Sequence, residues 1–258
     1  MLGYKNAIAA GVGILAMLIA GQVAAVYGWR STFLIYGVSL LFLLPGVILL
    51  RRAAPPPPAV QAAGDGFWRT LSGSWLIYAT TVLFGIVTMA PLTQLPFLLA
   101  EIGIEGAQKL SVILVCASAG SAVGAFLYGR IYARLGAAGT LMADMAAWGT
   151  GMAVLGTTAS DVHAAVGCLI AGIASGIFVV HMANLLVVRA APTQRGRAIG
   201  LLYVALFAGD FMTPIVLVPI AEAFTRHVMF LLLGAVCAAV LTVVAASRWP
   251  AGRRAAAG

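Results

Sequence analysis

The sequence contains very few charged residues. Of its 258 residues 9% are charged, whereas soluble domains have about 25%. Apolar residues make up 62% of the chain. Because 15 basic and 7 acidic side chains cannot cover a water-exposed surface, the composition excludes a soluble enzyme and a disordered chain. We therefore predict a polytopic membrane protein.

Cysteine is also scarce, and motifs for metal or cofactor binding are missing from the sequence. Cys116, Cys168 and Cys237 lie inside apolar runs, and their odd number fits neither a disulfide framework nor a metal spacing. We interpret them as small packing residues. The patterns GxxxxGK[ST], HExxH and GxSxG do not occur, so the sequence predicts no nucleotide-driven transport, no enzyme, no metal and no cofactor.

Eight apolar runs are long enough to cross a bilayer, which takes about 20 helical residues. They cover roughly residues 7–26, 32–50, 74–100, 110–129, 139–157, 163–188, 198–220 and 227–247. None shows the alternation that is typical of a transmembrane β-barrel. The predicted fold class is all-α, with eight transmembrane helices.

A proline-rich connection divides these runs into two and six. Residues 55–58 are four consecutive prolines, which favour a stiff, solvent-exposed linker. The predicted parts are two helices in residues 1–50, a cytoplasmic linker in 51–73, a six-helix half in 74–247 and a cytoplasmic tail in 248–258. A secretory signal peptide is an alternative interpretation of the first run, since Lys5 precedes its apolar stretch.

The basic residues sort to one side of the predicted membrane. With a cytoplasmic N-terminus, all of them except Arg30, Lys109 and Arg226 fall in inner segments. This distribution follows the positive-inside rule. It predicts a multi-pass protein of the plasma (inner) membrane with both termini cytoplasmic. Membrane topology therefore explains the net charge of +8, and we predict no nucleic-acid partner.

The first two runs match the last two. LIAGQ at 18–22 corresponds to LFAGD at 206–210, and FLIYG at 33–37 corresponds to FLLLG at 230–234. Two matches in the same order indicate duplication, and parallel six-helix halves are a known transporter plan. On this logic four helices of the first half would precede residue 1, so we expect an N-terminally truncated chain.

Three loop motifs, in the same order, carry a family resemblance. They are GWRSTF at 28–33, GRIYARLG at 129–136 and PTQRGRA at 192–198. The chain resembles helices five to twelve of the major facilitator superfamily of secondary transporters. In the cytoplasmic loop motif, Gly129, Arg130, Arg134 and Gly136 fit, and Ala133 replaces the family's acidic residue.

The resemblance implies secondary active transport of a small organic solute by alternating access. Proton coupling is expected, and efflux is favoured over uptake. Gly13 and Gly21 fit the motif of proton antiporters in helix five, whereas Met17 and Gln22 do not. One alternative is a transport-incompetent fragment or a partner subunit that needs a separate N-terminal half. A pore-forming oligomer is a third reading.

Asp210 is the candidate for proton coupling. It lies in the middle of the seventh run, and Pro214 removes the helical partner of its carbonyl. A carboxyl group in hydrocarbon favours its neutral form, so a protonatable acid at a flexible point suits a proton carrier. The structural alternative is a protonated aspartate that hydrogen-bonds to a neighbouring helix.

Two further groups are candidates for the substrate cavity. In the resemblance, the third and sixth runs match helices seven and ten, which line it. Gln94 lies between Pro91 and Pro96, which free two carbonyls of the third run. Tyr78, Thr81 and Thr88 are candidates because they fall on one helical stripe of the third run. Gln94 is a candidate because it lies in the kinked stretch. His181 and Asn184 are candidates because they share one face of the sixth run. The alternatives are threonine bonding within the helix and interhelical hydrogen bonding.

Other polar and small residues are given structural roles. Asp144 is expected to pair with Arg130 or Arg134 at the inner interface. Glu101 and Arg226 are expected to be solvated in separate outer loops. The glycine pairs 120/124 and 172/176 predict close helix packing.

Overall fold

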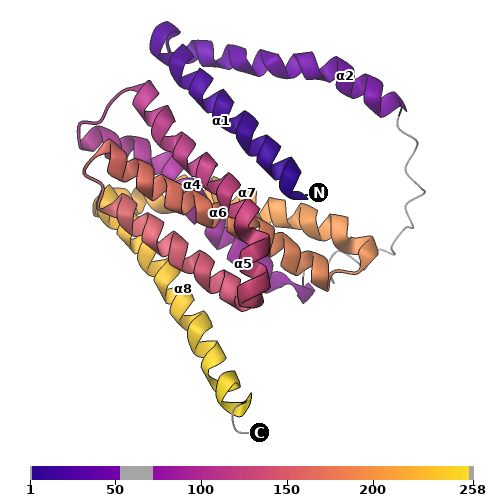
Figure 1. Cartoon of the computed structure of the whole chain (residues 1–258). Helices are drawn as coiled ribbons and strands as arrows, with labels where there is room; N and C mark the ends of the chain where they lie inside the picture. The colour runs from indigo at the N-terminus through magenta and orange to yellow at the C-terminus, as the bar shows by residue number, and fades with distance from the viewer. Residues whose placement is uncertain (1, 53–71, 256–258) are drawn as a thin grey trace.

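A computed structural model describes residues 2–52 and 72–255, and these are almost entirely helical (Figure 1). The elements are α1 (Leu2–Tyr27), η1 (Trp29–Gly37), α2 (Val38–Arg52), α4 (Trp75–Glu101), α5 (Ala107–Gly156), α6 (Asp161–Arg189), η2 (Pro192–Gln194), α7 (Arg195–Ala223) and α8 (Arg226–Ala255). The described ranges contain no strand, which confirms the all-α prediction. Five helices, α4 to α8, are long and apolar enough to cross a membrane.

Helix α5 is a hairpin of two arms rather than one rod. Gly136 has φ 66° and ψ −174° and interrupts the helix. With 50 residues, α5 supplies two spans of about 20 residues each, which accommodates the two runs predicted here. The first arm continues as far as Leu135, so Arg130 and Arg134 lie exposed on a helix and not in the predicted loop.

Gly136 occupies backbone geometry that is essentially restricted to glycine. We expect Gly136→Ala to lower the free energy of unfolding by about 1–3 kcal/mol, because the strain is imposed on the turn between the two arms. A Cβ at Gly136 would meet no atom within 4 Å, so the effect would come from the backbone alone. The measurement is denaturant unfolding in detergent.

The matched control is Gly200→Ala. Gly200 also has open space around it but lies inside α7 with ordinary helical geometry. Alanine should be neutral or slightly stabilising there. An equal decrease in the free energy of unfolding in both variants would contradict a special role for the Gly136 backbone.

Glycines bring α5 and α6 into backbone contact. A Cβ on Gly120 or Gly124 would run into the carbonyl oxygens of Leu169 or Ile173 on α6. The reverse holds for two glycines of α6, because a Cβ on Gly172 or Gly176 would strike the carbonyls of Ala117 or Ser121. The predicted packing role of the two glycine pairs is confirmed.

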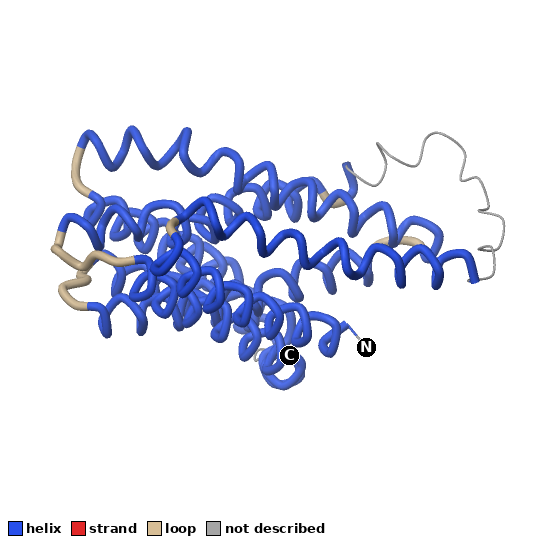
Figure 2. Tube along the Cα trace, turned by 90° about the horizontal axis from the view of Figure 1, so that it is seen from above, coloured by secondary structure: helices blue, strands red, loops and turns tan. Residues whose placement is uncertain are grey.

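Two further contacts organise the bundle. Gly85 of α4 and Gly209 of α7 face each other, and a Cβ on Gly209 would strike the Val82 carbonyl. Gly21 of α1 sits against Ser111 of α5. These contacts place α4 beside α7 and hold α1 against the first arm of α5 (Figure 1). Figure 2 shows that short loops connect the described helices.

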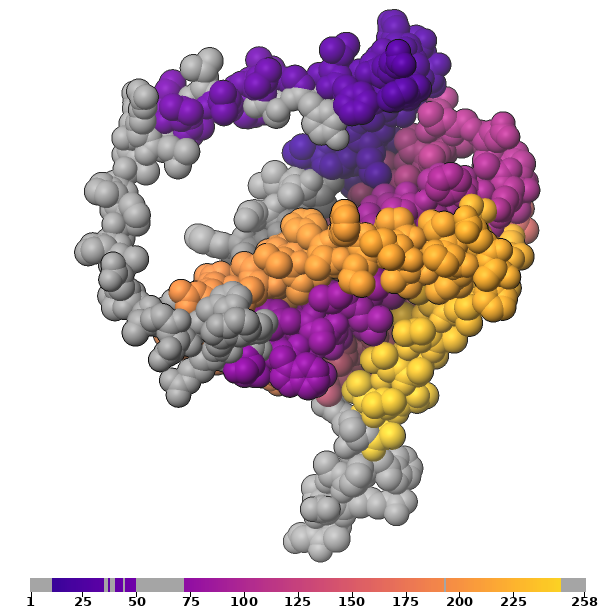
Figure 3. Space-filling view, turned by 180° about the vertical axis from the view of Figure 1, so that it is seen from behind, coloured from indigo at the N-terminus to yellow at the C-terminus, as the bar shows by residue number. Residues whose placement is uncertain are grey.

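Helices α1 and α2 form a layer beside the six-span bundle of residues 75–246 (Figure 1). Helix α1 packs on α5, whereas the main contact of α2 is η1. Helix α7 crosses the surface of the bundle seen in Figure 3. Its exposed apolar side chains include Tyr203, Phe207, Phe211 and Ile215, a spacing of four residues that puts them on one face.

An ion pair joins the C-terminal end of α4 to the N-terminal end of α8. The Arg226 guanidinium donates to the Glu101 carboxylate and lies over the Phe97 ring, 5.2 Å from its centroid. The prediction that Glu101 and Arg226 are separately solvated was wrong. It failed because sequence distance concealed that the end of α4 and the start of α8 are adjacent in space.

The prolines inside the spans do not end their helices. Helix α4 continues through Pro91 and Pro96, and α7 continues through Pro214 and Pro219. A proline inside a helix removes one backbone hydrogen bond. The carbonyls of Val87, Leu92 and Asp210 therefore lose their helical donors without a break in either helix.

Candidate solute cavity

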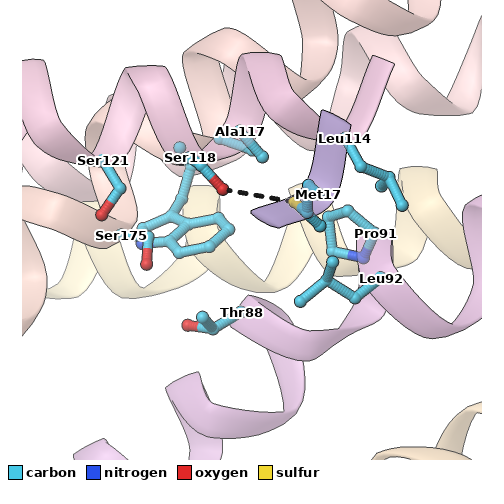
Figure 4. Close-up of a pocket in the computed structure, with 12 residues that line it drawn as sticks. Met17, Thr88, Pro91, Leu92, Leu114, Ala117, Ser118, Ser121 and Ser175 are labelled. Carbon is cyan, nitrogen blue, oxygen red and sulfur yellow. Dashed lines mark hydrogen bonds between the residues drawn. The ribbon is translucent and has the colours of Figure 1, made fainter. Parts of the chain in front are cut away.

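A cavity of about 170 Å³ lies between α1 and the second-half helices α4, α5 and α6 (Figure 4). Helix α1 contributes Met17, and the kinked part of α4 contributes Thr88, Pro91 and Leu92. The remaining lining residues are Leu114, Ala117, Ser118, Ser121, Trp148, Ala171, Gly172 and Ser175. The cavity therefore lies where the predicted first and second halves meet.

Four hydroxyl groups give the cavity its polar character. They belong to Thr88, Ser118, Ser121 and Ser175. The Thr88 hydroxyl donates to the Phe84 carbonyl at 2.7 Å, and the Ser118 hydroxyl donates to the Met17 sulfur at 3.7 Å. A hydroxyl that donates one bond still has lone pairs, so the wall can accept as well as donate hydrogen bonds.

No charged side chain is among the residues that line this cavity. Enclosing an ion without a counter-charge is very costly, whereas a neutral polar group needs only hydrogen bonds. Most of the remaining wall is apolar. The arrangement thus suits a small uncharged molecule with hydrogen-bonding groups, or a few waters.

Of the predicted α4 residues, Thr88 lines this cavity and the others lie elsewhere. The Tyr78 hydroxyl donates to the Ala198 carbonyl of α7 at 3.4 Å. The Thr81 hydroxyl donates to the Ile77 carbonyl of its own helix at 2.7 Å. Gln94 is buried, with 3% of its surface exposed, but is not a lining residue.

His181 and Asn184 belong to a second polar cluster, between α6 and the first arm of α5. The His181 Nδ1 atom lies 3.4 Å from the Tyr128 hydroxyl, and Asn184 follows three residues later on the same face of α6. The rings of Tyr128, Tyr132 and His181 have centroids 5.6–6.1 Å apart. The cluster is aromatic as well as hydrogen-bonding.

Sequence reasoning missed Tyr128 and Tyr132. A signal was present for Tyr128, because it follows Gly120 and Gly124 at intervals of four residues. Such spacing places all three on the face of α5 that meets α6. Extending the four-residue spacing of Gly120 and Gly124 by one more interval would have predicted that Tyr128 faces α6.

Asp210 lies where α7 crosses α4. It follows Gly209, whose missing side chain permits the close approach to α4. One of its carboxyl oxygens, Oδ1, is buried and has no hydrogen-bond partner among the described residues. Helices α4 and α7 thus hold a protonatable group at their closest contact.

The ion pair predicted for Asp144 is absent from the described structure. Both of its carboxyl oxygens are buried without a partner. Arg130 and Arg134 are exposed, and the Arg130 guanidinium lies over the Phe126 ring, 5.6 Å from its centroid. The prediction was wrong because Asp144 points into the bundle while both arginines lie on the other arm, beyond Gly136.

These features define a polytopic helical membrane protein whose apolar spanning helices line a partly open cavity between α1 and the helices α4, α5 and α6. The family model of the Major Facilitator Superfamily matches residues 1–214, and the chain belongs to this family. The prediction of family and fold is confirmed.

A solved structure gives a similar picture of the fold. The chain is similar to the crystal structure of the nucleoside transporter NupG, with a TM-score of 0.60 and 14% sequence identity. The match covers 90% of this chain and 64% of the NupG chain. At this identity the likeness shows the fold alone. No match was found among curated proteins.

Proposed function

We propose that the chain carries out secondary active transport of a small uncharged organic solute by alternating access. The cavity in Figure 4 is the observation that carries this proposal. Its wall combines Met17 of α1 with residues of α4, α5 and α6. A relative movement of the two groups of helices would therefore open or close it.

Proton coupling and efflux are the finer parts of the proposal. Support for protons comes from Asp210, a carboxyl group with a buried, unpartnered oxygen in a spanning helix, since intramembrane acids commonly mark proton pathways. Support for efflux comes from the resemblance of Gly13 and Gly21 to the antiporter motif. The coupled process would exchange external protons for internal solute across the plasma membrane.

The test is a transport assay with the purified chain in proteoliposomes under an imposed pH gradient. A panel of uncharged solutes, including nucleosides, polyols and amides, is compared with charged molecules of similar size. Saturable, proton-dependent movement of an uncharged solute is the expected result. Saturable transport of charged solutes alone would overturn the assignment of a neutral substrate.

Once a solute is found, Ser175→Ala should weaken its binding about fivefold. The variant removes one hydroxyl from the cavity wall, and a hydrogen bond contributes about 1 kcal/mol. The control is Thr150→Val, because the Thr150 hydroxyl donates to Ala146 on an exposed part of α5 outside this cavity. Equal affinities for Ser175→Ala and wild type would remove Ser175 from the binding site.

A second candidate function is that of a partner subunit that transports only with a separately encoded N-terminal half. It is favoured by the exposed apolar face of α7, which includes Tyr203, Phe207 and Phe211. The test is purification of the tagged chain from its own membranes, followed by intact-mass analysis. A co-purifying helical protein would support this candidate, and transport by the chain alone would exclude it.

A further inference from the structure

Two buried polar side chains in the second arm of α5 have no hydrogen-bond partner in the described part of the chain. They are Asp144, through both carboxyl oxygens, and Trp148, through its indole Nε1. Their exposed fractions are 0% and 1%. The large majority of buried polar atoms in native proteins are bonded to protein or ordered water. Two such groups in one place therefore call for a common explanation.

Asp144 and Trp148 lie on one face of the helix. Side chains four residues apart are neighbours, with Cβ atoms about 5–6 Å apart. Thr140 lies one turn before them and is also buried, but its hydroxyl is already bonded to the Gly136 carbonyl at 2.7 Å. The unpaired groups of this stripe are thus one carboxyl and one indole N–H.

The chemistry of the two groups is complementary. An indole N–H only donates, and a carboxyl group offers two oxygens as acceptors. One water molecule can accept from the indole and donate to the carboxyl, and buried waters typically make about three hydrogen bonds of this kind. A water between Asp144 and Trp148 would satisfy both.

Asp144 has no counter-charge. In the described residues, the sole ion pair is that of Arg226 with Glu101, and both carboxyl oxygens of Asp144 lack a hydrogen-bond partner there. The titratable group that faces it is the thiol of Cys237 on α8. An unpaired carboxylate in an apolar interior is strongly disfavoured relative to the neutral acid, so this bundle accommodates Asp144 with a proton bound.

Trp148 connects this acid to the solute cavity, since Trp148 is one of the cavity's lining residues. We propose that Asp144 and Trp148 form a site at the wall of the cavity that binds one proton and one water molecule, separate from Asp210. The site goes beyond the proposed transport function, because it holds its proton whether or not a solute is moved.

Infrared spectroscopy of the purified full chain tests the site without any solute. The chain has only seven acidic residues, so the C=O stretching bands of protonated carboxyl groups can be assigned by substitution. At pH 7 we expect such a band, which shifts in D2O and disappears in Asp144→Asn. The matched control is Asp210→Asn, which should leave this band in place.

Trp148→Phe keeps an aromatic side chain but removes the indole N–H, so it should move the Asp144 band to higher frequency through loss of a hydrogen-bonded neighbour. A spectrum of Asp144→Asn identical to that of wild type would overturn the proton site. An unshifted band in Trp148→Phe would overturn the pairing of the two residues. If Asp144→Asn does not fold, Asp144→Glu must displace the band, and an undisplaced band would overturn the proposal.

Discussion

Gly124→Ala should lower the free energy of unfolding by about 3 kcal/mol, at the upper end of the effect of adding a methyl group to a packed interior. The new Cβ would run into the Ile173 carbonyl oxygen and approach the Cα of that residue to 3.1 Å. Backbone atoms cannot rotate away as a side chain can. The helices α5 and α6 would have to separate along their contact. The loss is measured by denaturant unfolding in detergent.

Gly129→Ala is the matched control for this prediction. Gly129 lies on the same arm of α5 and is exposed, and a methyl group added to it would meet no atom within 4 Å. Alanine there should be neutral or slightly stabilising, because glycine is a poor helix former. If Gly124→Ala and Gly129→Ala had equal free energies of unfolding, the prediction would be wrong, because α5 and α6 would then accommodate the added methyl group without loss of stability.

The packing of the spanning helices could be predicted from local patterns. Glycines four residues apart identify a helix face that admits a neighbour, and Gly120, Gly124, Gly172 and Gly176 behave accordingly. Apolar runs of about 20 residues located the spans of α4 to α8 for the same reason, since bilayer thickness sets their length. The first two predicted runs correspond to shorter apolar helices in the described residues. Glycine spacing and the length of an apolar run can be read from the sequence because each is a property of a single helix.

The polar site depended on which helices meet, so sequence predicted it less well. Thr88 was predicted for the cavity, whereas Ser118, Ser121 and Ser175 were missed because small hydroxyl residues in apolar helices are commonly packing residues. Asp144 was misassigned because two arginines were near it in sequence. The direction of its side chain depends on how the α5 hairpin folds at Gly136.

Asp210→Asn should abolish accumulation of solute driven by a pH gradient while the protein still folds and exchanges solute. Asparagine has nearly the same shape as aspartate, but its side chain cannot bind and release a proton near neutral pH. One oxygen of the native carboxyl is buried without a partner, so the substitution breaks no hydrogen bond of that oxygen among the described residues. The measurement compares gradient-driven accumulation with solute counterflow in proteoliposomes.

The control for this prediction is Glu222→Gln, which removes another acid from α7 but at its exposed C-terminal end. A solvated carboxylate exchanges protons with water in every conformation, so its loss should leave coupling intact. The Asp210 carboxyl is partly buried at the crossing of α4 and α7, so a movement of these helices would change its exposure and make proton binding depend on conformation. If Asp210→Asn still accumulates solute under a pH gradient, the coupling proton does not bind at Asp210.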